Sequence, residues 1–284
     1  MNQFAKITWR LIRTPPASGA WNMAVDEAIL EAVLQGLSPP TLRLYAWNPP
    51  CLSLGYAQPF ADVNQEQLQS HGWDLVRRPT GGRSILHTDE LTYAVIGLQS
   101  DPRLSGSVLE SYRNLSQALL KVLHLLAIPA TIKGKRSSNN KDRNGIQKSP
   151  IKNPVCFEVP SDYEIVCNGK KLIGSAQARR KEGVLQHGSL PLGGDLTHII
   201  DALQFPDPAT RSKAEQRLLA RATTAEQILG YELEWQTAAA AFEKAFAEVL
   251  DLQLENSELT TNEYNRTEIL VEEKFANPDW TLRI

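Results

Sequence analysis

The chain has 284 residues and a net charge of -2, with 42% hydrophobic and 22% charged residues. These are ordinary globular values, which exclude disordered and fibrous classes. It has no apolar run of about eighteen residues, and Met1–Arg13 lacks the apolar core of a signal peptide, so we expect a soluble cytoplasmic protein. Three irregularly spaced cysteines, Cys51, Cys156 and Cys167, argue against a disulfide framework or a zinc knuckle.

The first predicted element is an amphipathic helix. Apolar residues recur at helical spacing over Ala20–Gln35, with Ser18 as a possible cap and Gly36 as a stop. Two short strands are expected at Thr41–Trp47 and Cys51–Tyr56, separated by a pair of prolines. The alternation of their apolar residues predicts one buried face for each strand.

A glycine turn between two predicted strands is the most distinctive stretch of the sequence. A short helix over Asp62–Ser70 leads into a strand, Asp74–Arg78, and an apolar strand resumes at Leu91–Val95. Between them, Arg77–His87 reads RRPTGGRSILH. Its glycine pair lets backbone N–H groups approach a ligand closely, so the turn could hold an anion. Plain turn chemistry is the commoner use of such a pair.

A long amphipathic helix is predicted over Ser107–Leu126, where it should cover the sheet. The composition then changes, because residues 133–152 hold seven basic residues and one acid. This segment has no apolar periodicity, which predicts a poorly ordered basic loop. It is either a solvated insertion without a role or a surface that attracts an acidic protein partner.

Two consecutive hairpins are predicted next. Asn168-Gly169 is a strong hairpin signal between Tyr163–Cys167 and Lys171–Ala176. A second hairpin joins Ile173–Arg179 to Val184–Pro191.

From about residue 195 the chain is expected to be helical. The predicted segments are Asp195–Gln204, Lys213–Arg221, a helix opened by a capping box at Thr224–Gln227, Thr237–Leu250 and Thr260–Phe275. Alternating helices and strands without a linker predict one α/β domain over residues 1–284.

Two residues could carry covalent chemistry. Cys156 lies between prolines in an irregular loop where substrate could reach it, although buried packing is the commoner fate of a cysteine. Lys171 lies among apolar neighbours, where a lysine can exchange protons near neutral pH, although a surface lysine on an edge strand is commoner. The histidines lack metal-ligand spacing, so no metal site is predicted. There is neither a Walker sequence nor GxGxxG, which leaves a nucleotide site open.

Three segments together resemble the biotin/lipoate protein ligase superfamily. Arg77–His87 is similar to its arginine-glycine signature, Gly169–Gln177 to its lysine-bearing GxKxxGSA segment, and Gln186–Leu190 to its HG[ST]L strand. The resemblance covers most of the chain and implies a mixed β-sheet flanked by helices.

Within this superfamily the chain resembles the octanoyltransferase branch in which the cysteine precedes the lysine. The resemblance implies Cys156 and Lys171 as catalytic residues and no cofactor, because a thioester is already activated. Arg83, where similar ligases commonly carry a third glycine, points the same way. The implied substrate-binding residues are Arg78, Thr80, Gly81, Gly82, Arg83, His87, Gly174, Ser175, Ala176, His187 and Gly188.

The implied reaction is a two-step acyl transfer. Cys156 would take octanoyl from acyl carrier protein, and a lysine of a lipoyl-domain protein, such as glycine cleavage H protein or a 2-oxoacid dehydrogenase component, would then accept it. Lys171 would act as general base and acid. Both partners are acidic, which gives the basic loop a rationale; we expect a monomer and no nucleic-acid or membrane partner. An ATP-dependent lipoate or biotin-type ligase and a non-catalytic carrier-binding module are the alternatives.

Overall fold

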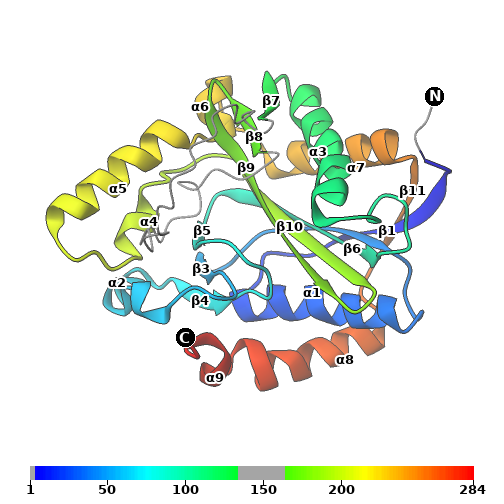
Figure 1. The fold of residues 1–284 in the computed structure, drawn as a ribbon, viewed down its shortest axis with the longest axis horizontal. Helices are drawn as coiled ribbons and strands as arrows, with labels where there is room; N and C mark the ends of the chain where they lie inside the picture. The colour runs from blue at the N-terminus through cyan, green and yellow to red at the C-terminus, as the bar shows by residue number, and fades with distance from the viewer. Residues whose placement is uncertain (1–3, 134–163) are drawn as a thin grey trace, which may run out of the picture.

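The computed structural model describes residues 4–133 and 164–284, and Figure 1 shows their arrangement. The strands are β1 (Ile7–Arg13), β2 (Thr41–Tyr45), β3 (Cys51–Leu54), β4 (Asp74–Arg77), β5 (Ile85–His87), β6 (Glu90–Leu98), β7 (Ala130–Lys133), β8 (Glu164–Cys167), β9 (Lys170–Arg180), β10 (Gly183–Pro191) and β11 (Leu252–Ser257). The helices are α1 (Gly19–Leu34), η1 (Phe60–Asp62), α2 (Gln65–His71), α3 (Val108–Leu125), α4 (His198–Asp201), α5 (Pro208–Arg221), α6 (Ala225–Leu229), α7 (Trp235–Leu250), α8 (Thr261–Leu270), the π-helical η3 (Val271–Phe275) and α9 (Pro278–Thr281).

The predicted mixed sheet flanked by helices is confirmed. Eight strands form the main sheet in the order β11-β1-β2-β6-β10-β9-β8-β7, and a second sheet has the order β4-β3-β5. β1 runs parallel to both of its neighbours, whereas β2, β6, β10 and β9 alternate in direction. The predicted single buried face of β2 and β3 is wrong: every residue of both strands is buried. Packed elements cover both faces of these strands, so alternation in the sequence understates their burial.

Helices pack on both faces of the main sheet (Figure 1). On one face, α3 and α7 bury a cluster that includes Tyr93, Phe242 and Phe246. On the other face, α1 packs against the sheet and is itself covered by α8 and η3. A third cluster joins the small sheet to α4 and α5. The sheet is therefore an internal layer, and polar groups on it are cut off from water.

Both predicted hairpins are confirmed, and they share β9 as one continuous strand. Asn168 and Gly169 have φ values of 50° and 78°. A two-residue turn with both φ values positive matches the right-handed twist of the flanking strands. The second turn begins at Lys181, whose φ is 51°. The turns fix the register in which β9 and β10 present their side chains.

The helices were predicted with mixed accuracy. The Ser18 cap of α1 is confirmed, because its side chain accepts a hydrogen bond from the Trp21 N–H. The helix predicted from Asp195 is only α4, a single turn of four residues. At α6, Thr224 accepts the Gln227 N–H, but the Gln227 side chain accepts from the Thr223 hydroxyl, so the predicted capping box is incomplete.

Four strands escaped prediction: β1, β7, β11 and β5, whose residues Ile85–His87 were assigned to the glycine turn. β1 carries Arg10, whose charge suggests an exposed segment, yet its guanidinium forms a buried bidentate pair with Glu263 at 3.0 and 2.6 Å. Lys133, assigned above to the basic loop, is the last residue of β7. The rest of that loop and Cys156 lie outside the described residues. No helix in the described part of the chain is long and apolar enough to cross a membrane.

Candidate active site

A cavity lies between α1, the small sheet and the β6-β10-β9 part of the main sheet. All three sequence motifs contribute to its wall. Their lining residues are Arg78, Gly82, His87, Gly174, Ser175, Ala176, His187 and Gly188. Ile85 and Ser189, which lie in the motifs but were not among the predicted binding residues, also line it, and residues outside the motifs complete the lining: Met23, Tyr45, Trp47, Ser53 and Thr92. Segments up to about 160 residues apart in the sequence therefore meet around one cavity.

The two arginines of the signature turn hold backbone in place. Arg77 donates to the carbonyls of Gly55, Gln58 and Thr281, at 2.9, 2.6 and 2.8 Å. It thereby ties the end of the chain to the turn, and its burial lowers the pKa of its guanidinium.

Arg78 performs the same task within the turn itself. Its guanidinium donates to the carbonyls of Ser53, Gly81 and Arg83, at 2.9, 3.0 and 2.6 Å. These contacts of both arginines are with protein oxygens, so the arginines shape the turn into a wall of the cavity.

Two glycines allow strands and turn to approach closely. Gly82 has a φ of +96°, and a Cβ on the facing Gly55 would lie 1.9 Å from the Gly82 carbonyl oxygen. In β10, a Cβ on Gly188 would lie 2.4 Å from the Gly174 carbonyl oxygen and 2.8 Å from the Tyr93 ring. Neither site has room for a side chain, which is the physical reason for glycine in these motifs.

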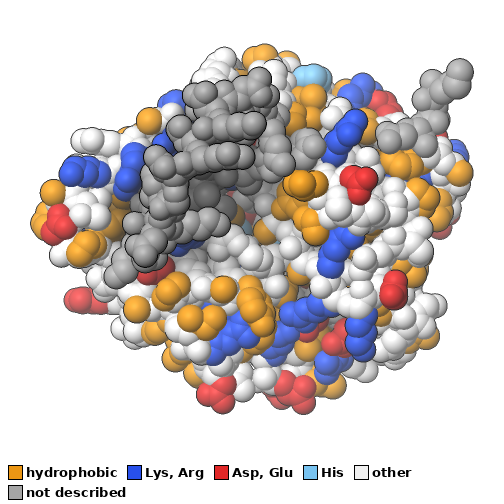
Figure 2. Space-filling view, in the orientation of Figure 1, with side chains coloured by type: hydrophobic (Ala, Val, Ile, Leu, Met, Phe, Trp, Pro, Cys, Tyr) orange, Lys and Arg blue, Asp and Glu red, His pale blue; other side chains and the backbone are white. Residues whose placement is uncertain are grey.

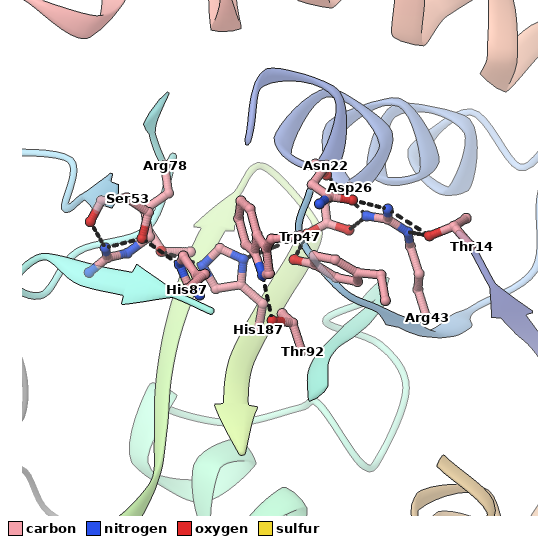
Figure 3. Close-up of polar contacts among 12 residues, drawn as sticks. Thr14, Asn22, Asp26, Arg43, Trp47, Ser53, Arg78, His87, Thr92 and His187 are labelled. Atoms are coloured by element: carbon pink, nitrogen blue, oxygen red, sulfur yellow. Dashed lines mark hydrogen bonds and ion pairs between the residues drawn. The ribbon is translucent and has the colours of Figure 1, made fainter. Parts of the chain in front are cut away.

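His87 is held on three sides (Figure 3). Its Nδ1 lies 2.7 Å from Glu90 Oε1, its Nε2 lies 2.7 Å from Ser53 Oγ, and Trp47 stacks on its ring at 4.0 Å. The order Ser53–His87–Glu90 matches that of a serine–histidine–carboxylate triad. However, Arg78 Nη1 also donates to Ser53 Oγ at 3.1 Å, and Trp47 covers one face of the His87 ring. We therefore interpret these three hydrogen-bonded residues as support for the cavity wall.

His187 links the signature turn to the middle of the sheet. Its Nε2 lies 2.7 Å from Thr80 Oγ1, and its Nδ1 lies 3.6 Å from Asp26 Oδ2. Burial lowers the pKa of His187 despite the opposing effect of Asp26. With Nδ1–H facing Asp26, a neutral His187 accepts from the Thr80 hydroxyl. Asp26 in turn forms an ion pair with Arg43, and its Oδ1 lies 2.7 Å from Arg43 Nη1 (Figure 3). Neither side chain has any exposed surface.

The structure describes one of the two predicted catalytic residues, Lys171. Lys171 lies in β9, only 7% exposed, with its Nζ 3.1 Å from Glu164 Oε1. It is not among the described residues that line the cavity. Cys156 lies outside the described residues. Burial raises the pKa of both Cys51 and Cys167, so neither is suited to act as a thiolate at neutral pH.

A wider groove opens beside the cavity and shares Gly82 with it. Gly81, Arg83, Arg179 and Arg180 line this groove, and the described lining includes no acid. Figure 2 shows Lys and Arg side chains gathered in the lower middle of this face. Three of the predicted binding residues therefore do not line the cavity itself: Gly81 and Arg83 line the groove, and Thr80 holds His187.

A family model described as the lipoyl protein ligase A/B catalytic domain matches residues 18–247. The chain belongs to this family. Proteins named octanoyltransferase LipM from Kyrpidia tusciae and Bacillus subtilis are 40% and 36% identical to it. These alignments cover 97% and 98% of this chain and 99% of each relative.

Solved structures of the lipoyl protein ligase family share its fold. A structure described as a bipartite lipoate protein ligase and its lipoyl domain from Thermoplasma acidophilum matches with a TM-score of 0.79 and 21% identity, over 97% of this chain and 96% of that one. A lipoate-protein ligase A bound with ATP matches with a TM-score of 0.76 and 21% identity, over 97% and 99%. Among the described residues of the present chain, no cluster of three or more His, Cys, Asp or Glu side chains could hold a metal ion.

Proposed function

We propose that this protein is an octanoyltransferase that moves an octanoyl group from acyl carrier protein to a lysine of a lipoyl-domain protein in lipoate biosynthesis. One observation carries the proposal: all three superfamily motifs line a single cavity, whose lining surface is mostly apolar and includes Met23, Trp47 and Ile85. An apolar lining with a few polar groups suits the hydrocarbon chain of an acyl group. Proteins named octanoyltransferase that match almost the whole chain support this choice of substrate.

The reaction proceeds through an acyl-enzyme. The Cys156 thiolate attacks the thioester carbonyl, a new carbon–sulfur bond forms, and the carrier thiol leaves with a proton. The acceptor lysine then attacks the Cys156 thioester, loses a proton and forms an amide as the Cys156 thiolate leaves. Lys171 supplies and removes these protons, and Glu164, at 3.1 Å from its Nζ, orients it. Conversion of a thioester to an amide is downhill, so ATP is not consumed.

The groove beside the cavity suits an acidic carrier. Arg83, Arg179 and Arg180 line it, and Gly82 belongs both to the groove and to the cavity. A carrier docked there places its acyl arm next to the cavity entrance, and opposite charge accelerates the encounter. We propose that one monomer, acting as a single catalytic domain, uses this surface for both carriers.

Intact mass spectrometry tests the proposal. The protein is incubated with octanoyl acyl carrier protein without ATP, and the expected result is an octanoyl adduct that survives dilution and is removed by neutral hydroxylamine. Cys156→Ala should abolish the adduct, while Cys167→Ala, which removes a buried thiol, should retain it.

Three results would contradict the proposal. An equal adduct on Cys156→Ala would place the nucleophile elsewhere. Product formation only with ATP and free octanoate would identify a ligase. Binding of the carrier without adduct or product would identify a binding module.

A further inference from the structure

One hydroxyl in the cavity wall has no hydrogen-bond partner. Ser189 in β10 is 1% exposed, and its buried Oγ makes no hydrogen bond. The other hydroxyls of the described lining are paired: Ser53 with His87, Thr92 with Trp47, Ser175 with Tyr93, and Tyr45 with Asp26. Buried polar groups in proteins are nearly always hydrogen-bonded, so an unpaired one facing a cavity indicates a ligand atom.

The strand register gives the place of Ser189 within the cavity. Ser189 pairs with Gly174 of β9 and with Thr92 of β6. It follows His187 by two residues, so both side chains lie on the same face of the sheet. Gly174 is three residues from Lys171 along β9, roughly 10 Å at the usual rise of a strand. Along β9, the residue paired with Ser189 is therefore nearer to Lys171 than Ala176, the residue paired with His187.

The proposed substrate has one polar group that can satisfy this hydroxyl. Apart from the pantetheine arm, which both test ligands below share, an octanoyl thioester is hydrocarbon except at its carbonyl oxygen and sulfur. The cavity lining also includes Met23, Trp47 and Ile85, whose side chains offer apolar surface to the chain. A hydroxyl that donates to a hydrocarbon gains nothing, whereas a carbonyl oxygen is a hydrogen-bond acceptor.

Building on the proposed octanoyl transfer, we propose that Ser189 Oγ donates a hydrogen bond to the carbonyl oxygen of the acyl thioester and fixes that carbonyl at the Gly174 end of the cavity. When a thiolate attacks the carbonyl carbon, the π electrons move onto this oxygen. They return when the carbon–sulfur bond of the leaving thiol breaks. Ser189 keeps its proton throughout, and its hydrogen bond strengthens while the oxygen is negative.

A pair of ligands that differ only in the carbonyl tests the assignment without relying on turnover. S-octanoyl pantetheine carries the oxygen and S-octyl pantetheine lacks it. In a Cys156→Ala background, calorimetry should show that Ser189→Ala weakens the octanoyl ligand about 3- to 10-fold, the usual loss for one neutral hydrogen bond, and leaves the octyl ligand unchanged. Ser189→Thr, which keeps the hydroxyl, should restore the preference. Ser116→Ala removes a buried serine of α3 outside the cavity and should alter neither affinity.

Two further measurements separate this role from packing. With Cys156 present, Ser189→Ala should slow formation of the acyl adduct about 100-fold, as expected for one oxyanion donor. Its urea midpoint should not fall, because the free protein loses no hydrogen bond. Equal weakening of both ligands, unchanged octanoyl affinity or a wild-type rate of acylation would overturn the assignment. A protein that forms no adduct but still prefers the octanoyl ligand through Ser189 would support the assignment and refute the proposed transfer.

Discussion

Replacing Asp26 by alanine should destabilise the protein more than any surface substitution. Asp26 and Arg43 form an ion pair, Nη1 to Oδ1, at 2.7 Å in the middle of the molecule, where neither side chain is exposed. Tyr45 also donates its hydroxyl to Asp26 Oδ2 at 3.1 Å. Asp26→Ala leaves the Arg43 charge without a counterion and the Tyr45 hydroxyl without its acceptor.

The magnitude follows from this burial. Breaking a buried ion pair by removing one partner costs about 3–5 kcal/mol, because the remaining charge stays out of water. Arg43 keeps neutral partners, with Asn22 Oδ1 at 2.7 Å and Thr14 Oγ1 at 2.9 Å, so we place the loss in the free energy of unfolding at about 4 kcal/mol. Domains are stable by only about 5–15 kcal/mol, so this is a large share of the total.

Urea unfolding followed by tryptophan fluorescence measures the effect. Asp26→Ala should lower the midpoint by roughly 1–2 M at an ordinary denaturant slope. Glu243→Ala is the matched control, since it breaks the half-exposed pair with Arg13 and should cost less than about 1 kcal/mol. The double variant Asp26→Leu with Arg43→Met should be more stable than Asp26→Ala, because no unpaired charge remains. A loss for Asp26→Ala no larger than that of the control would refute the reasoning.

Three other predictions concern the cavity and its groove. Burial lowers the pKa of His187 below its value in the unfolded chain, so the unfolded chain takes up the proton first as the pH falls. The free energy of unfolding should therefore fall as the pH drops below about 6.5. In urea titrations at pH 7.5 and 5.5, His187→Gln should show a smaller difference in the free energy of unfolding than the wild type. Gly188→Ala places a Cβ 2.4 Å from a backbone oxygen of β9 and should lower the free energy of unfolding by about 1–3 kcal/mol. Gly81→Ala is the control, because its Cβ meets nothing within 4 Å, and it should change the free energy of unfolding by less than about 0.5 kcal/mol. Equal melting temperatures of the two variants would contradict this. Arg180→Ala removes a cation from the groove and leaves Glu27 paired with Lys274. At low salt it should raise KM for a carrier-borne thioester about two- to five-fold and leave KM for a small thioester unchanged. A KM for the carrier that does not depend on salt would argue against the groove as a docking surface.

Local signals in the sequence were sufficient for much of the fold. The Asn168-Gly169 turn, the Ser18 cap of α1 and the amphipathic pattern of α3 depend on interactions within a few residues, and each was predicted. β1 and β11 were not predicted, because they are stabilised by pairing with each other across about 240 residues of chain. Such non-local pairing leaves little trace in either strand alone.

The candidate site shows the same division. Motif resemblance found His87, His187 and Gly188, because each belongs to a compact signature. It missed Ser53 and Asp26, which lie in an ordinary strand and an ordinary helix. Asp26 has the appearance of a solvent-facing acid in the sequence, yet it lies under the sheet beside His187.

The sequence by itself determined the chemical groups and their local geometry: a glycine turn, a lysine after a tight hairpin, and a histidine-glycine pair in a strand. Those features depend on backbone freedom and neighbouring side chains, which short segments specify. Only the tertiary structure decided that the signature arginines bind backbone carbonyls and that Ser189 alone among the described cavity hydroxyls lacks a partner. Partners and burial depend on segments that meet only after folding, so no local pattern encodes them.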